Sequence, residues 1–176
     1  QGEKGNDRPQ VAPPASGFLY HLYCSQLNPG ARDLVEELPT MQDRLTEGYT
    51  AYRDAARQAH PQASIHIVPV GEVFRAVWQE ELDAGLDPTS EDTLFHQLYA
   101  NDGSHPSATG TFVISGTVVA SMTGRHPSPQ EGLVELGLDL AIQEHLSGLV
   151  SEVILDHPLD STFDMPWVHP WEEWNG

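Results

Sequence analysis

Residues 64–71, SIHIVPVG, constrain the fold more than any other stretch of the chain. Most apolar residues in this short run are β-branched, and Gly71 closes it, which is typical of a buried strand. An amphipathic pattern precedes it over 40–60, and a second one follows over 72–85. Strand and helix therefore alternate along the most legible part of the chain, and this order predicts an α/β protein.

The ends of the two flanking helices carry recognisable signals. Thr40 is a candidate N-cap for the first helix, and Pro61 ends it. Glu72 suits the start of the second helix because its carboxylate faces the positive end of the helix dipole. Gly85 suits its C-terminal cap.

The remaining segments are less regular, and they set the expected domain limits. Residues 17–27 fit a helix, 32–38 a short strand, 109–124 either a helix or a strand, and 131–155 a helix interrupted by glycines. We expect a polar, proline-rich arm at 1–16, an α/β domain over 17–155, and a tail rich in Trp and Pro at 156–176. Only 64–71 is a clear strand, so part of the expected parallel sheet is missing from the chain.

The charge balance and the cysteine count exclude several functions. The 176 residues contain 8 Lys and Arg against 26 Asp and Glu, which gives a net charge of -18. Such a surface repels a polyanion, so we expect no nucleic-acid partner. No apolar run is long enough to span a membrane, and we expect no membrane partner. Cys24 is the only cysteine, which excludes an internal disulfide and a thiolate zinc cluster.

The segment Asp102-Gly-Ser-His105 holds the candidate catalytic residues. An Asp and a His three residues apart in a turn can meet, so that the carboxylate holds one imidazole nitrogen while the other accepts a proton. Ser107 could cap a helix that follows this turn. The alternative for the same residues is a structural Asx-type turn that carries an exposed histidine.

The longer string DGSHPSATGTF, with SMTGRHP after it, resembles the terminal block of the SGNH hydrolases, also called GDSL-like hydrolases. Upstream, GYTAYRDAARQ and IHIVPVGEVF are similar to a helix and strand step of that family, so the resemblance covers about 40–125. It implies a three-layer α/β/α sandwich with a parallel, flavodoxin-like sheet. It also implies an ester hydrolase in which His105 is the general base and Asp102 its orienting partner. The implied substrate is an acyl or O-acetyl ester, for example on a carbohydrate, and no cofactor is implied.

The chain departs from the family pattern at the nucleophile. The family places its Ser in a Gly-Asp-Ser motif near the start of the domain, and this sequence has no such motif. Ser104 and Ser107 flank His105 but do not follow a strand, so we nominate neither. We therefore expect an N-terminal segment with the first strands and the Ser to lie outside this chain, for example on a second chain. The alternative is a non-catalytic binding or assembly subunit built on the same frame.

Two further features allow weaker functional interpretations. The nine histidines form no His-x-x-x-His pair, although DHPLD at 156–160 and HPWEE at 169–173 could supply metal ligands. Histidines and acids are also common on an acidic surface, so we assign no metal site. Trp167, Trp171 and Trp174 could stack on sugar rings or pack against the domain.

Overall fold

A computed structural model describes residues 17–20, 37–103, 105–156, 163 and 165. The elements, in chain order, are β1 (Gly17–Tyr20), α1 (Glu37–Ala59), β2 (Ile65–Val68), α2 (Val70–Asp83), α3 (Leu94–Gln97), α4 (Ala108–Thr123), α5 (Glu131–Val134), α6 (Leu140–Ser151) and a π-helical turn, η1 (Glu152–Asp156).

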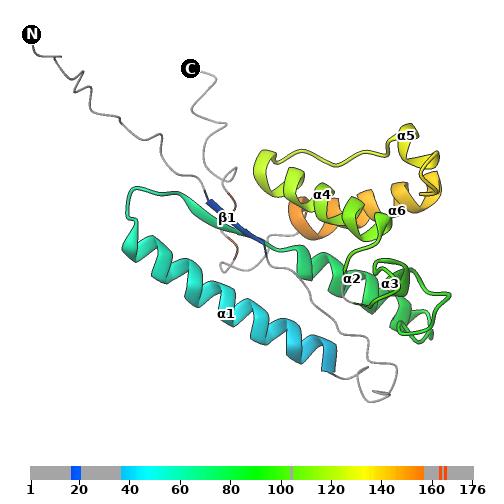
Figure 1. Ribbon diagram of the computed structural model, residues 1–176, viewed down its shortest axis with the longest axis horizontal. Coiled ribbons are helices and arrows are strands. Elements are labelled where there is room, and N and C mark those ends of the chain that lie inside the picture. Colours follow the sequence, from blue (N-terminus) through cyan, green and yellow to red (C-terminus); the bar gives the residue numbers. More distant parts are fainter. Residues whose placement is uncertain (1–16, 21–36, 104, 157–162, 164, 166–176) are drawn as a thin grey trace, which may run out of the picture.

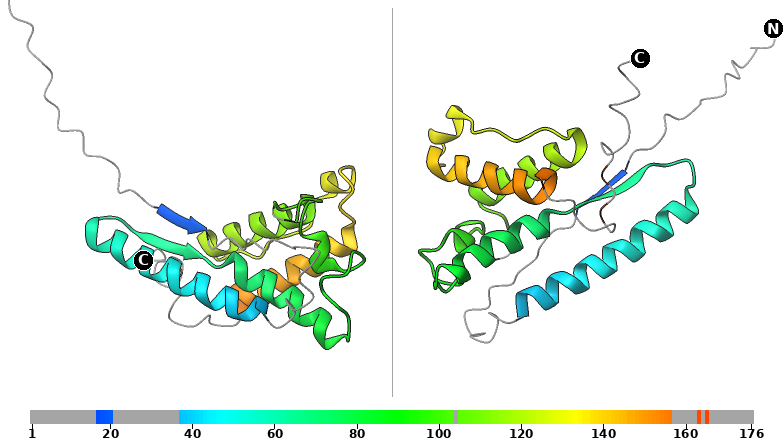
Figure 2. Two further views of the ribbon diagram at one scale, coloured as in Figure 1. Left: turned by 60° about the horizontal axis from the view of Figure 1, so that its bottom comes forward. Right: turned by 180° about the vertical axis from the view of Figure 1, so that it is seen from behind.

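The two strands form a parallel pair in the middle of the molecule. Gly17 of β1 lies opposite Ile65 of β2, and the register continues to Tyr20 opposite Val68. Helix α1 lies on one side of the strands, and α4 and α6 lie on the other (Figures 1 and 2). Helix α2 leaves the end of β2 directly, after Pro69.

The predicted three-layer sandwich with a parallel sheet is wrong. Over the described ranges, strand is limited to two four-residue segments, whereas α1, α2, α4 and α6 have 23, 14, 16 and 12 residues. The helix-rich structure is unlike an α/β SGNH domain. Residues 109–124, which could have added a strand, are helical instead. The small buried residues Gly110, Gly116 and Ala120 of α4 let this helix approach its neighbours closely.

Two predictions near the N-terminus are also wrong. Residues 17–20, expected to be helical, form β1, and the rest of 17–27 lies outside the described residues. Residues 37–38, expected to end a short strand, are the first turn of α1. Because α1 begins at Glu37, Thr40 lies within the helix and does not cap it.

The central helix–strand–helix prediction is confirmed. Helix α1, strand β2 and helix α2 lie where the periodicity places them. Gly85, with φ of 76°, follows the C-cap of α2 in the left-handed conformation that glycine adopts without strain. The side chain of Ser107 caps α4, as expected from its position. The segment 131–155 breaks at Gly137 (φ 88°), between α5 and α6.

An aromatic cluster joins α2 to α3 and to the loop that follows. The rings of Trp78 and Phe95 meet edge to face, with centroids 4.7 Å apart. Tyr99 contacts Phe74 at 5.8 Å and Phe95 at 5.6 Å, and all four residues are buried. Such pairs stabilise a core beyond their buried area. The cluster therefore fixes the start of the loop that carries Asp102 and His105.

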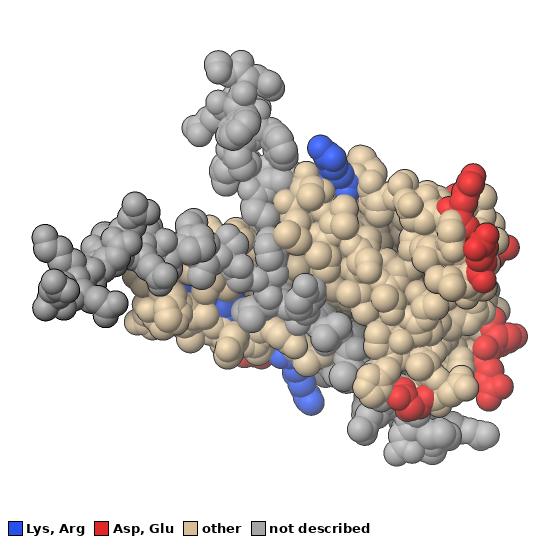
Figure 3. Space-filling view, turned by 45° about the horizontal axis from the view of Figure 1, so that its top comes forward, with Lys and Arg blue, Asp and Glu red and all other residues tan. Residues whose placement is uncertain are grey.

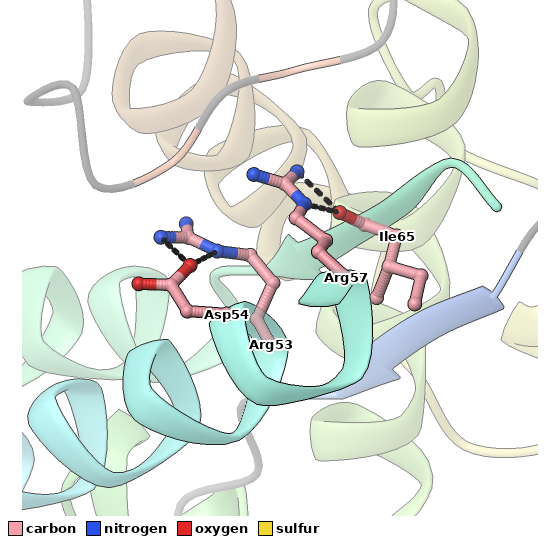
Figure 4. A network of polar contacts seen from close by, with 4 residues as sticks. All are labelled: Arg53, Asp54, Arg57 and Ile65. Atoms are coloured by element: carbon pink, nitrogen blue, oxygen red, sulfur yellow. Dashed lines mark hydrogen bonds and ion pairs between the residues drawn. The ribbon is translucent and has the colours of Figure 1, made fainter. Parts of the chain in front are cut away.

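Arg57 of α1 joins this helix to β2 (Figure 4). Nε of Arg57 donates to the carbonyl oxygen of Ile65 at 2.8 Å, and a second guanidinium nitrogen donates to the same oxygen. The buried Arg53 pairs with its neighbour Asp54 at 2.8 Å. The backbone carbonyl at the start of β2 is thus satisfied by a charged donor.

None of the helices in the described part of the chain is both long and apolar enough to cross a membrane. The predicted arm at 1–16 lies outside the described residues, as does most of the tail. Within the tail, Phe163 and Met165 are buried and pack with Ile67 of β2.

Candidate functional site

The loop between α3 and α4 is tied together by backbone hydrogen bonds. The amide of Ser107 donates to the carbonyl of Leu98 at 2.9 Å, and the amide of Ala100 donates to the carbonyl of His105 at 2.8 Å. The two ends of the loop thus form a short antiparallel contact. The loop has few ways to move without breaking these bonds, so its tip is held in a defined position.

Asp102 and His105 lie at the tip of this loop and contact each other twice. Asp102 Oδ1 accepts the backbone N–H of His105 at 2.9 Å, and Oδ2 lies 2.6 Å from Nδ1 of the ring. Gly103, with φ of 67°, makes the bend between them possible. One carboxylate therefore orients both the backbone and the imidazole of the same residue, as the spacing of the two residues predicts.

This geometry has a definite chemical consequence for the histidine. When Nδ1 carries the proton and donates it to Asp102, the lone pair is on Nε2, which is then the basic nitrogen. The carboxylate also stabilises the imidazolium that forms when Nε2 takes a proton. The side chains of His105 and Asp102 are 78% and 51% exposed, so water screens their attraction.

Ser107 lies close to this pair but has a structural role. Its Oγ donates to the carbonyl of Gln97 at 2.5 Å and accepts the amide of Gly110 at 3.1 Å. Both bonds hold the first turn of α4 against the end of α3. The hydroxyl of Ser107 is therefore engaged at both ends in helix capping, and Ser104 lies outside the described residues.

A buried carboxylate supports the loop from α2. Oε1 of Glu81 accepts the amide of Phe95 at 3.0 Å, in the first turn of α3. Burial raises the pKa of Glu81, and the hydrogen bonds from the amides of Phe95 and Leu94 oppose that rise. Glu81 thereby fixes the short helix that leads into the loop.

An acidic groove between α2 and α6 is a second polar cluster, and sequence analysis missed it. Nε2 of His145 lies 2.9 Å from Oε2 of Glu80, and Glu144, Glu152 and Asp156 also line the groove. Glu80 and His145 are 65 residues apart. No local motif links them, so only the packing of α6 on α2 could have revealed the pair.

The described side chains form no group of three or more His, Cys, Asp or Glu that could hold a metal ion. Nearly all of the two segments considered as ligand sources, 156–160 and 169–173, lie outside the described residues, as do the three tail tryptophans.

Comparison of the chain with protein-family models, with curated proteins and with solved structures gave no match. The resemblance to SGNH hydrolases thus rests only on the motifs quoted above, and it stays a hypothesis.

Proposed function

We propose that Asp102 and His105 are the acid–base pair of an ester hydrolase whose nucleophilic serine lies outside this chain. The observation that carries the proposal is the double contact of one carboxylate with one histidine, at 2.6 Å to Nδ1 and 2.9 Å to the backbone amide. The resemblance to the SGNH motif suggests an acyl or O-acetyl ester as substrate, for example on a carbohydrate.

The chemistry follows from the tautomer that Asp102 favours. Nε2 of His105 accepts the proton of the serine hydroxyl while the serine oxygen attacks the ester carbonyl carbon. The imidazolium, stabilised by Asp102, then protonates the leaving alkoxide as the acyl group stays on the serine. Water, deprotonated by the same nitrogen, hydrolyses the acyl intermediate and restores the hydroxyl.

The exposure of the pair favours a second candidate, a non-catalytic binding or assembly subunit. An acid–base pair acts most strongly where water is excluded, because fixed dipoles then replace a mobile solvent. His105 is 78% exposed in this chain. In the binding candidate, the carboxylate–histidine contact is a structural turn before α4 and has no catalytic role.

Hydrolysis of p-nitrophenyl acetate by the isolated chain separates these two candidates. Water replaces the missing serine here, so His105 acts only as a general base, an effect that reaches 10²–10⁴-fold in buried enzyme sites. We expect His105→Ala and Asp102→Asn to hydrolyse the ester about tenfold more slowly than wild type, a smaller loss than that range because the pair is exposed. His60→Ala, which removes another exposed histidine at the end of α1, is the matched control and should keep the rate. Equal rates for the wild type and all three variants would contradict the hydrolase proposal and favour the non-catalytic binding subunit.

A further inference from the structure

Asp102 differs from every other aspartate of the chain in the residue that follows it. The sequence holds 26 Asp and Glu residues, and in the view of Figure 3 acidic side chains gather along one edge of the molecule. Asp102 and Gly103 nevertheless form the only Asp-Gly pair. Because glycine has no side chain, its backbone nitrogen approaches the carboxyl carbon of a preceding aspartate with the least hindrance. An Asp-Gly bond is therefore the aspartyl bond most susceptible to spontaneous isomerisation.

The isomerisation has two steps, and water is the only molecule exchanged. In the first step, the backbone nitrogen of Gly103 bonds to Cγ of Asp102. The amide proton and the hydroxyl of the protonated carboxyl group leave as water, which gives a succinimide ring. In the second step, water adds to one ring carbonyl carbon and the bond from that carbon to nitrogen breaks. Opening at the main-chain carbonyl gives isoaspartate, in which the chain runs through Cβ and Cγ and the carboxylate stands on Cα.

We propose that Asp102 is a site of isoaspartate formation, and that the contacts of its carboxylate with His105 suppress the reaction in the folded chain. Oδ1 accepts the backbone N–H of His105 at 2.9 Å, and Oδ2 lies 2.6 Å from Nδ1 of the ring. The carboxyl group is thus held by both oxygens in one orientation. An oxygen that leaves as water must first give up its hydrogen bond to His105, which opposes the first step.

The attacking nitrogen is held as well. The N–H of Gly103 donates to the carbonyl of Ala100 at 2.9 Å, so this bond must also open before the nitrogen can attack. Burial does not provide the protection, because the Asp102 side chain is 51% exposed and water reaches the loop tip. The hydrogen bonds of the tip are therefore what separates a stable aspartate from a reactive one.

Conversion to isoaspartate would end the contact between Asp102 and His105. The backbone gains one carbon between residues 102 and 103, and the carboxylate moves one carbon closer to the main chain. It then no longer lies opposite both the amide and the ring nitrogen of His105. This inference does not rest on the proposed hydrolase, because the same contacts suppress the reaction if the loop is only a structural turn.

Ageing of the full chain measures the protection. Wild type is incubated for several weeks at neutral pH, folded in buffer or unfolded in guanidinium chloride. An endoproteinase that cleaves before aspartate but not before isoaspartate, followed by mass spectrometry, quantifies the conversion at residue 102. We expect the unfolded chain to convert at least about tenfold faster, because three hydrogen bonds hold the reacting groups in the folded chain. Equal rates in the two states would overturn the proposal without any variant.

Two substitutions test whether His105 provides the protection. His105→Ala removes the ring contact and keeps the backbone amide, so the ratio of unfolded to folded rates should fall about two- to tenfold, the worth of one hydrogen bond. His105→Asn is the matched control, because its side-chain amide can donate from nearly the position of Nδ1 and should keep most of the protection. Each ratio uses the same chain folded and unfolded, so effects of local sequence cancel, and circular dichroism checks that both variants fold. An unchanged ratio in His105→Ala, or the same loss in both variants, would overturn the role given to His105.

Discussion

Gly110 is the point at which α4 presses against the loop that carries Asp102 and His105. A Cβ atom added there would lie 2.1 Å from the carbonyl oxygen of Leu98 and 3.2 Å from Cβ of Pro106. Real Cβ atoms essentially never approach other atoms closer than 3.0 Å. Gly110→Ala must therefore displace either the first turn of α4 or the backbone at Leu98 by about 1 Å.

The size of the effect follows from the bonds that this displacement disturbs. The Leu98 carbonyl accepts the amide of Ser107 at 2.9 Å, and the amide of Gly110 donates to Ser107 Oγ at 3.1 Å. Overpacking with a backbone shift costs about 1–3 kcal/mol, and a weakened hydrogen bond about 1 kcal/mol more. Alanine returns about 1 kcal/mol of helix propensity. We expect Gly110→Ala to lower the free energy of unfolding by about 1–3 kcal/mol.

Urea unfolding followed by circular dichroism measures this change. Gly148→Ala is the matched control, because Gly148 is an exposed glycine of α6 with no atom within 4 Å of an added Cβ. That variant should gain about 0.5–1 kcal/mol from helix propensity alone. If Gly110→Ala were as stable as Gly148→Ala, the close contact between α4 and the loop, and hence the rigid placement of His105, would be refuted.

Three further predictions use the same unfolding assay. Ser107→Ala should cost about 0.5–2 kcal/mol through loss of the α4 cap, and an unchanged midpoint would contradict that role. Gln143 is buried, accepts the amide of Gln130 at 2.7 Å and donates to the carbonyl of Leu138 at 2.9 Å. Gln143→Leu leaves the Gln130 amide and the Leu138 carbonyl without a partner and should lower the free energy of unfolding by about 2–4 kcal/mol. A decrease below about 0.5 kcal/mol would show that water takes the place of the Gln143 side chain. The raised pKa of Glu81 means that the folded state binds its proton more tightly than the unfolded state. Wild type should therefore lose stability relative to Glu81→Gln as pH rises above about 4.3, and a difference that is constant with pH would contradict the burial of this charge.

The sequence predicts those parts of the fold in which local pattern and local structure agree. Helix α1, strand β2 and helix α2 have regular apolar spacing and clear breaks between them, so periodicity is sufficient to place them. Helix α4 is rich in β-branched residues and has no charged side chain to mark a solvent face, so its residues fit a strand equally well. Its packing decides the outcome, since Gly116 lies so close to Pro127 that an added Cβ would come within 3.3 Å of that ring.

Strand β1 could not be predicted because its partner is distant. Phe18 pairs with His66, which is far along the chain, and no spacing within GFLY indicates this register. Sequence distance also explains why one of the two polar clusters could be predicted and the other could not. Asp102 and His105 are three residues apart, so a turn can bring them together, and their contact was predictable. Glu80 and His145 meet only because two helices pack side by side.

The tautomer of His105 is the measurement that bears most directly on the proposed acid–base pair. In a two-dimensional ¹H–¹⁵N spectrum recorded at about pH 8.5, where an ordinary histidine is neutral, the two ring nitrogens of His105 give separate signals. The 2.6 Å contact with Asp102 predicts a proton on Nδ1 and a lone pair on Nε2, and it predicts that Asp102→Asn shifts the proton toward Nε2. A wild-type ring protonated mainly on Nε2, with no change in the variant, would contradict the claim that Asp102 prepares His105 to act as a base.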